Sequence, residues 1–206
     1  GEVLAYVANA GDLSSAPYVD GIQARRQAGS TLKPFLYGSA IEKRIISAAS
    51  LIDDSPLDIA TSRGVYRPEN YDKEFRGPVT ARTALASSLN IPAVKTLNLV
   101  GTENFVAQLR SLGFTGLAEP EHYGPSLALG SADISLWELV NAYRTLANGG
   151  ITSGLRLTPR NTGFTRRQVL SREAAFIVSD IISDREARSS TFSLENPLAT
   201  RFWTAV

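Results

Sequence analysis

Residues 29–44 read GSTLKPFLYGSAIEKR and combine a helical pattern with two reactive side chains. Apolar residues recur at helical spacing through this stretch, which predicts a helix from Ser30 to about Arg44. Pro34 has no N–H to donate to the carbonyl four residues earlier, so it is tolerated only in the first turns of a helix. Ser30 is therefore expected at, or very near, the helix N-terminus.

Ser30 and Lys33 stand three positions apart, which places a hydroxyl and an amine on one face of that helix. A serine hydroxyl is a poor nucleophile until a base takes its proton, and a lysine can do so when burial and positive neighbours lower its pKa. The N–H groups and dipole of a helix N-terminus also favour a developing oxyanion. The pair is thus a candidate for nucleophilic catalysis. Taken alone, the motif is weak, and a serine cap beside a solvated lysine is the favoured interpretation of it.

The composition is typical of a folded domain and includes few residues that could bind a metal or carry out redox chemistry. With 206 residues, 43% hydrophobic and 20% charged, the chain can bury a core, which excludes disorder, collagen-like repeats and a coiled coil. The net charge of +1 does not indicate a nucleic-acid surface. No Cys and a single His exclude a zinc finger, a cysteine nucleophile and most transition-metal sites, so no metal or cofactor is expected. No apolar run approaches about 18 residues, so no membrane span is predicted.

Other catalytic sites have weaker support in the sequence. His122 is the single histidine and lies in a turn-rich stretch, and no Gly-x-Ser-x-Gly elbow accompanies it, so a Ser-His-Asp hydrolase is not favoured. Asp53 with Asp54, or Glu119 with Glu121, could pair as the carboxylates of a glycosidase, but solvated loop charge is the favoured interpretation. Phosphate loops and dinucleotide fingerprints are missing.

The remaining pattern predicts a strand, several helices and a final strand. Residues 1–8 and the tail 201–206 are predicted strands that pair in one sheet, and residues 52–77 are predicted to be a long irregular connection. Further helices are predicted over residues 80–87 with Thr80 as N-cap, from Pro92 in a first turn to about 100, and over 103–112, 135–148 and, as the last helix, 171–183. Because the chain contains no Met and opens on Gly1, it is interpreted as a piece of something longer.

Two stretches taken together, residues 29–35 (GSTLKPF) and 87–94 (SSLNIPAV), resemble the transpeptidase domain of penicillin-binding proteins. Members of that family carry Ser-x-x-Lys, then Ser-x-Asn, then Lys-Thr-Gly. The first motif matches Ser30 to Lys33, and the second matches Ser88 to Asn90. Residues 66–71, 77–80, 128–130 and 142–150 also resemble the family. The resemblance spans nearly the whole chain and is strongest to the bifunctional class A enzymes, with the 1C subgroup among them.

The sequence departs from the family in one respect, since it contains no Lys-Thr-Gly. Residues 202–206 look like the start of the strand that carries this motif in the family. The resemblance therefore implies that residues 1–206 are a single partial transpeptidase domain, without an N-terminal glycosyltransferase domain and without the Lys-Thr-Gly strand onwards. The expected fold is of the α/β (α+β) class: an antiparallel sheet flanked by helices with a mainly helical subdomain, incomplete here. The isolated piece is expected to be inactive.

The resemblance also implies a reaction. Ser30 would attack the D-Ala-D-Ala bond of a peptidoglycan stem peptide, and Lys33 would accept its proton. Ser88 would relay that proton to the leaving amine, and Asn90 would hydrogen-bond Lys33 or the substrate. An amine of a neighbouring stem peptide would resolve the acyl-enzyme into a cross-link, and β-lactam antibiotics would acylate the same serine. The implied partners are stem peptides, β-lactams and the remainder of its own polypeptide, and no nucleic acid. The implied location is the periplasmic face of the bacterial inner membrane, with an anchor upstream of Gly1.

Three alternatives share the serine nucleophile. A serine β-lactamase would hydrolyse its acyl-enzyme with a glutamate in a Glu-x-x-Leu-Asn loop. Glu119 and Glu121 fall in a comparable region, but neither begins that pattern. A D,D-carboxypeptidase would use water in place of the second amine, and a non-catalytic penicillin-binding module would be acylated without turnover. The lifetime of the acyl-enzyme separates the β-lactamase from a slowly deacylating enzyme.

Overall fold

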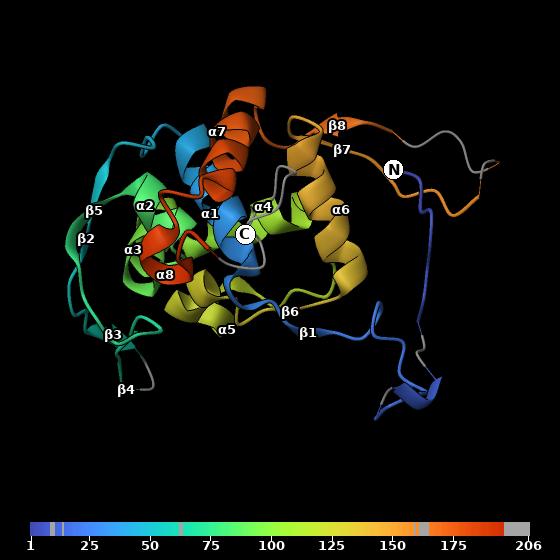
Figure 1. Cartoon of the computed structure of the whole chain (residues 1–206), viewed down its shortest axis with the longest axis horizontal. Helices are drawn as coiled ribbons and strands as arrows, with labels where there is room; N and C mark the ends of the chain where they lie inside the picture. The colour runs from blue at the N-terminus through green and yellow to red at the C-terminus, as the bar shows by residue number, and fades with distance from the viewer. Residues whose placement is uncertain (9–10, 14, 62–63, 159, 161–164, 196–206) are drawn as a thin grey trace.

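The computed structural model describes residues 1–206 except 9–10, 14, 62–63, 159, 161–164 and 196–206 (Figure 1). Its α-helices are α1 (Lys33–Glu42), α2 (Ala81–Ala86), α3 (Asn90–Val100), α4 (Thr102–Leu112), α5 (Pro120–Tyr123), α6 (Leu136–Ala147), α7 (Arg172–Ser183) and α8 (Ser189–Phe192). Its strands are β1 (Arg26–Gln27), β2 (Leu51–Asp54), β3 (Ile59–Thr61), β4 (Gly64–Tyr66), β5 (Gly77–Thr80), β6 (Asp133–Ile134), β7 (Ile151–Thr152) and β8 (Arg167–Gln168). Three 3₁₀ helices cover Gly11–Leu13, Gly29–Leu32 and Gly124–Leu129.

Helix α1 forms the centre of the fold, and the other long helices surround it (Figure 1). Every residue from 33 to 41 is buried, and α1 packs against α3 and α7. The Phe35 ring meets Tyr143 edge-on with centroids 5.2 Å apart and Phe114 at 6.2 Å. Burying each such aromatic or aliphatic side chain stabilises the fold by about 1.5–3 kcal/mol. A lysine at the start of this helix is therefore forced into an apolar interior.

The predicted helices are confirmed, and their ends follow local capping chemistry. The Thr80 and Ser171 side chains accept hydrogen bonds from Thr83 N and Ala174 N at the starts of α2 and α7. Ser135 begins α6 with a capping box, a reciprocal pair of hydrogen bonds with Glu138. The helix predicted from Ser30 begins as a 3₁₀ turn and continues as α1. Helix α7 was predicted to be the last, which is wrong, because the short α8 follows it.

No large sheet is present among the described residues. The strands form four separate antiparallel pairs: β1 with β6, β2 with β5, β3 with β4, and β7 with β8. The predicted sheet between the two ends of the chain is not tested at its C-terminal strand, since residues 201–206 lie outside the described part. The described part of the fold is a helical assembly with small two-stranded antiparallel pairs around it (Figure 1).

Residues 52–77 were predicted to be irregular, and the structure corrects this. Strand β2 pairs along its whole length with β5, with Ile52 opposite Val79, while β3 and β4 form a hairpin between them. Strand β2 alternates exposed and buried residues, so it turns Ile52 and Asp54 toward the interior. Gly64 and Gly77 are the first residues of β4 and β5, and Pro56 and Pro68 lie in the connections between strands, so these residues do not mark one long loop.

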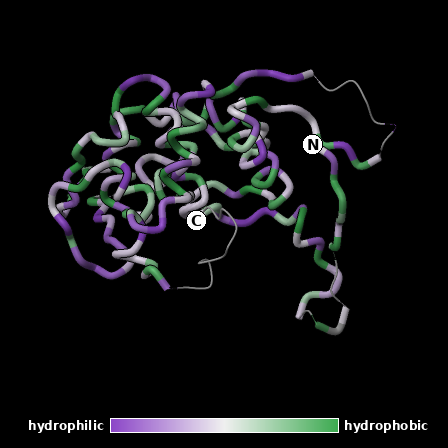
Figure 2. The backbone as a smooth tube through the Cα atoms, turned by 45° about the horizontal axis from the view of Figure 1, so that its top comes forward, coloured by the Kyte–Doolittle hydropathy of each residue, from purple (hydrophilic) through white to green (hydrophobic). Residues whose placement is uncertain are grey.

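The strand predicted over residues 1–8 is also wrong as stated. The described segment makes one isolated bridge, between Glu2 and Arg156, and then runs outward as an arm (Figure 1). Its apolar residues stay in solvent, with Leu4 90% and Val7 75% exposed, and Figure 2 shows hydrophobic colour along this arm. A β-rich apolar stretch becomes a strand only where a neighbouring backbone satisfies its N–H and C=O groups. Among the described residues that neighbour is limited to Arg156.

None of the helices in the described part of the chain is both long and apolar enough to cross a bilayer.

Candidate active site

Ser30 lies in the 3₁₀ turn Gly29–Leu32, directly before α1, and is exposed. A backbone hydrogen bond holds this turn in place, because the Gly29 N–H donates to the Gly130 carbonyl at 3.0 Å. A Cβ at Gly130 would lie 1.9 Å from the Gly29 oxygen, and Gly130 also has a φ of +74°. Only glycine permits this contact of two backbones. The approach holds the hydroxyl-bearing turn at the tip of the buried helix.

Lys33 is the first residue of α1, and it is only 1% exposed. Its amine donates hydrogen bonds to the Ser88 carbonyl at 2.6 Å, to Asn90 Oδ1 at 2.7 Å and to the Ser88 hydroxyl at 3.2 Å. All three acceptors are uncharged. The amine is thus held by a fixed set of dipoles without a carboxylate among them.

Burial lowers the pKa of Lys33 from 10.5 to about 7. The cause is desolvation, which disfavours the ammonium form. An amine with this pKa is present in both protonation states near neutral pH. It can therefore take a proton from a hydroxyl and return it later, which an ordinary surface lysine cannot do efficiently.

Ser88 lies between α2 and α3 in a left-handed backbone conformation, with a φ of +54°. Such a conformation is unfavourable for a residue with a side chain and persists where the surroundings enforce it. The turn is enforced by hydrogen bonds from Ser88 N to the Leu85 carbonyl at 3.0 Å and from Leu89 N to the Ala84 carbonyl at 2.9 Å. The result is that both the carbonyl and the hydroxyl of Ser88 lie within reach of Lys33.

Asn90 opens α3, and its side-chain amide is oriented by two neighbours. Its Nδ2 donates to the Glu69 carbonyl at 2.7 Å, so its oxygen is left to accept from Lys33. Its backbone N–H donates to Asn70 Oδ1 at 2.8 Å. Residues 69 and 70, which lie between β4 and β5, thus hold both the side chain and the backbone N–H of Asn90.

All four residues selected from the sequence line two cavities that share Ser30 and Ser88. The smaller, of about 160 Å³, includes Lys33 in its wall, and the larger, of about 530 Å³, includes Asn90. Lys33, Ser88 and Asn90 are joined directly by hydrogen bonds. Ser30 shares the cavity wall with them, although its hydroxyl is not among the hydrogen-bond partners of Lys33 in the described structure.

Several residues of this site were missed by sequence reasoning. Tyr143 lines the smaller cavity, and its hydroxyl donates to the Thr31 carbonyl at 3.0 Å. Burial raises the pKa of Tyr143 to about 12, so it stays protonated at neutral pH. Phe192 of α8 lines both cavities, and Asn70 lines the larger. Helical spacing could place Tyr143 on a buried face, but no local pattern pointed to Asn70 or Phe192.

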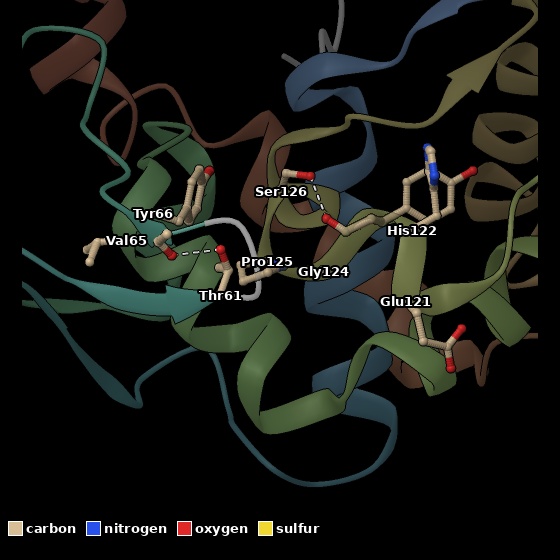
Figure 3. A pocket seen from close by; sticks show the side chains of 10 residues that line it. Thr61, Val65, Tyr66, Glu121, His122, Gly124, Pro125 and Ser126 are labelled. Atoms are coloured by element: carbon tan, nitrogen blue, oxygen red, sulfur yellow. Dashed lines mark hydrogen bonds between the residues drawn. The ribbon is translucent and has the colours of Figure 1, made fainter.

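The other candidate residues do not enter these cavities. Glu121 and His122 are exposed residues of α5 and line a different cavity of about 470 Å³, which is walled on its other side by the β3–β4 hairpin (Figure 3). Glu119 is exposed and pairs with Arg110 at 3.2 Å. No Ser-His-Asp arrangement therefore joins His122 to Ser30, and the solvated reading of the two glutamates is confirmed.

Asp53 and Asp54 behave differently from one another. Asp53 is at the surface and pairs with Lys95 at 2.8 Å. Asp54 was predicted to be solvated loop charge, which is wrong, because it is fully buried at 0% exposure. The alternation of β2 turns it inward, where Asn70 and Arg76 surround it. Within the described residues, no group of three His, Asp or Glu side chains could hold a metal ion.

Comparison with known proteins identifies the family of this arrangement. The family pattern described as "Penicillin binding protein transpeptidase domain" matches residues 1–195. Penicillin-binding protein 1C of Escherichia coli (strain K12) is 39% identical over 175 residues, covering 84% of this chain and 22% of that protein. Penicillin-binding protein 2D of Bacillus subtilis (strain 168) is 33% identical over 195 residues, covering 89% of this chain and 28% of that protein.

The crystal structure of penicillin-binding protein 1A from Haemophilus influenzae matches with a TM-score of 0.71 at 22% identity. The match covers 80% of this chain and 30% of that one, and it shows a shared fold. The chain thus spans less than a third of each of these relatives.

Proposed function

The chain belongs to the penicillin-binding protein transpeptidase domain family, and from this premise we propose that Ser30 is a nucleophile acylated by the D-Ala-D-Ala end of peptidoglycan stem peptides and by β-lactams. One observation carries the proposal. An accessible hydroxyl shares a cavity with a buried amine whose pKa is about 7. A nucleophile and a base matched to neutral pH are the two parts that acyl transfer requires.

In the proposed reaction, Ser30 Oγ forms a bond to the carbonyl carbon of the penultimate D-alanine. The hydroxyl proton passes to Lys33 Nζ, the C–N bond to the terminal D-alanine breaks, and the proton moves to the leaving nitrogen. The product is an ester on Ser30. An amine of a second stem peptide then attacks the ester carbon, the C–O bond breaks, and Ser30 regains a proton while the cross-link forms.

The hydrogen bonds of the site support separate roles for Ser88 and Asn90. A neutral Lys33 has two N–H donors, which match its two shortest bonds, to the Ser88 carbonyl and to Asn90 Oδ1. The lone pair of the neutral amine is then left for the Ser30 proton, and the ammonium that forms can donate its third N–H to the Ser88 hydroxyl, which lies 3.2 Å away. Ser88 is therefore the proposed proton relay to the leaving group, and Asn90 the group that holds the amine in place.

The carboxylate chemistry of the site favours transfer over hydrolysis. A β-lactamase needs a base that activates water against the acyl-enzyme. Asp72 is the carboxylate among the residues that line the larger cavity, and its hydrogen bond from Arg76 at 2.5 Å holds its pKa below the usual value. A carboxylate stabilised in this way is a weak base, so Asp72 is not favoured as the group that activates water.

Cross-linking itself is proposed for the full-length protein, because the chain spans less than a third of the relatives compared above. We also propose the remaining family features for the full-length protein. These are a Lys-Thr-Gly strand, an additional glycosyltransferase domain, and a position at the periplasmic face of the inner membrane with an anchor outside this chain.

The pH dependence of acylation tests the proposal. Lys33 must be neutral to accept the Ser30 proton, so the acylation rate constant is expected to be constant above about pH 8. It is expected to fall as the pH drops through about 7, approaching a tenfold loss per pH unit below pH 6. Stopped-flow measurement with a chromogenic β-lactam between pH 5 and 9, on the full-length protein, gives this profile.

The neighbouring groups allow a clear assignment of that profile. Tyr143 has its pKa raised to about 12, and Asp72 has its pKa lowered, so neither changes charge between pH 6 and 9. A single transition near pH 7 would therefore report on Lys33. A rate constant that is flat from pH 5 to 9 would contradict a proton acceptor of this kind.

A further inference from the structure

Asp54 and Asn70 form a buried pair behind the site. Asp54 is fully buried and Asn70 is 4% exposed. The Asn70 amide donates from Nδ2 to both oxygens of Asp54 at 2.9 Å and to the Glu74 carbonyl at 2.8 Å. The Arg76 backbone N–H adds a bond to Asp54 Oδ2 at 3.1 Å. Burying a carboxylate is costly unless its oxygens are fully hydrogen-bonded, and here N–H donors supply those bonds.

The pairing fixes which way the Asn70 amide faces. Its NH₂ group is committed to Asp54 and Glu74, so its oxygen must point the other way. That oxygen accepts the backbone N–H of Asn90 at 2.8 Å. This N–H belongs to the first turn of α3, where backbone donors have no partner within the helix. Asn70 thus supplies a bond that α3 cannot make for itself.

Glu69, the residue before Asn70, holds the side chain of Asn90. The Glu69 carbonyl accepts from Asn90 Nδ2 at 2.7 Å, and Asn90 Oδ1 in turn accepts from Lys33. Hydrogen bonds therefore connect the Asp54 carboxylate through Asn70 to the backbone N–H of Asn90, and the side chain of the same Asn90 binds the Lys33 amine. Each link has one orientation, because each amide has its donors and its acceptor assigned.

We propose that Asn70, oriented by Asp54, is a positioning residue that sets Asn90 and thereby the Lys33 amine against Ser30; this inference rests on the proposed function. Asn70 acts through another residue and not on the reacting atoms. A shift of about 1 Å in a reacting group can slow catalysis by about 10²-fold, so a lost positioning bond is expected to matter.

The test is acylation of the full-length Asn70→Ala variant by a chromogenic β-lactam, followed by stopped flow. The limiting acylation rate constant at saturating β-lactam is expected to fall by roughly 10- to 100-fold. The non-covalent dissociation constant is expected to stay within about twofold. The active fraction, titrated with the same compound, is expected to stay near that of the unmodified protein. A purely structural role would lower the active fraction and leave the rate constant of the folded molecules unchanged.

Two further variants keep the result decisive. Asp54→Asn preserves volume and removes one acceptor, so it is expected to slow acylation in the same direction by a smaller factor, and it decides the matter if Asn70→Ala does not fold. Thr145→Val is the matched control, because Thr145 is 1% exposed and its side chain donates one hydrogen bond, to the Asn141 carbonyl, away from Asp54, Asn70 and Asn90. It is expected to acylate at the unmodified rate.

The outcomes separate the inference from the function. If the unmodified protein is acylated and folded Asn70→Ala or Asp54→Asn reacts at the same rate constant, the positioning role is overturned and the function stands. A loss confined to the active fraction overturns it equally. If the unmodified protein is not acylated at all, the proposed function is refuted, and with it the inference that rests on it.

Discussion

Replacing Ser30 by alanine in the full-length protein is expected to abolish covalent labelling by a fluorescent penicillin. The hydroxyl oxygen is the atom that would form the ester, and the methyl group of alanine cannot substitute for it. Loss of a nucleophilic serine costs on the order of 10⁶-fold in rate, which places residual labelling below detection. Gel fluorescence after denaturation measures the covalent adduct directly. Because Ser30 is exposed and lies in a turn held by Gly29 and Gly130, the substitution should leave folding intact.

Ser47→Ala provides the control for that experiment. Ser47 is also exposed and follows the end of α1, and its hydroxyl contacts Ser50 at 3.3 Å outside the cavities. Its labelling is expected to equal that of the unmodified protein. Persistent labelling of Ser30→Ala, with the control unchanged, would refute Ser30 as the nucleophile.

Lys33→Ala is expected to slow acylation by roughly 10²–10⁴-fold, the scale of a lost general base. The serine remains in place but loses the neighbouring amine whose pKa is about 7. The variant also leaves the Ser88 carbonyl and Asn90 Oδ1 without their partner, at a cost of about 1–3 kcal/mol for each unsatisfied group. Removing a desolvated ammonium offsets part of that cost.

The acylation rate constant therefore has to be measured on the folded fraction, which thermal unfolding and active-site titration determine. Lys43→Ala is the matched control, since Lys43 caps the opposite end of the same helix and is exposed. It should react at the unmodified rate. An undiminished rate constant for Lys33→Ala would show that another group accepts the proton.

Local chemistry explains why much of the fold could be predicted. Capping by Thr80, Ser135 and Ser171, and the position of Pro34, depend on residues within one helical turn. Such information is present in the sequence without knowledge of distant contacts. The burial of Lys33 is different, because it depends on α3 and α7 packing around α1. No local pattern separates a buried lysine of this kind from a solvated one.

The same distinction between local and distant contacts decides which residues of the site could be grouped from the sequence. Ser30 and Lys33 could be related by helical spacing alone. Their grouping with Ser88 and Asn90, which lie 55 and 57 residues beyond Lys33, came from family resemblance. The left-handed backbone at Ser88, which turns the second motif toward the amine, has no signal in residue type, because glycine or asparagine is the usual choice there.

Asp54 shows most clearly what the sequence could not provide. Two adjacent aspartates among Pro and Gly residues are typical of a solvated loop. Their fates diverge only because β2 pairs with β5 and alternates its side chains. Asn70 and Arg76 donate the hydrogen bonds that satisfy the Asp54 carboxylate, and they lie 16 and 22 positions further along the chain. A buried hydrogen-bond network of this length is determined by tertiary structure.

The account depends most on the identity of the acylated atom. Peptide mapping by tandem mass spectrometry, after brief treatment of the unmodified full-length protein with benzylpenicillin, determines it. The expected result is one penicilloyl group per molecule, attached to Ser30, with Ser88 unmodified. A penicilloyl group on any other residue, or none at all in protein that is folded, would contradict the assignment of this cavity as the acylation site.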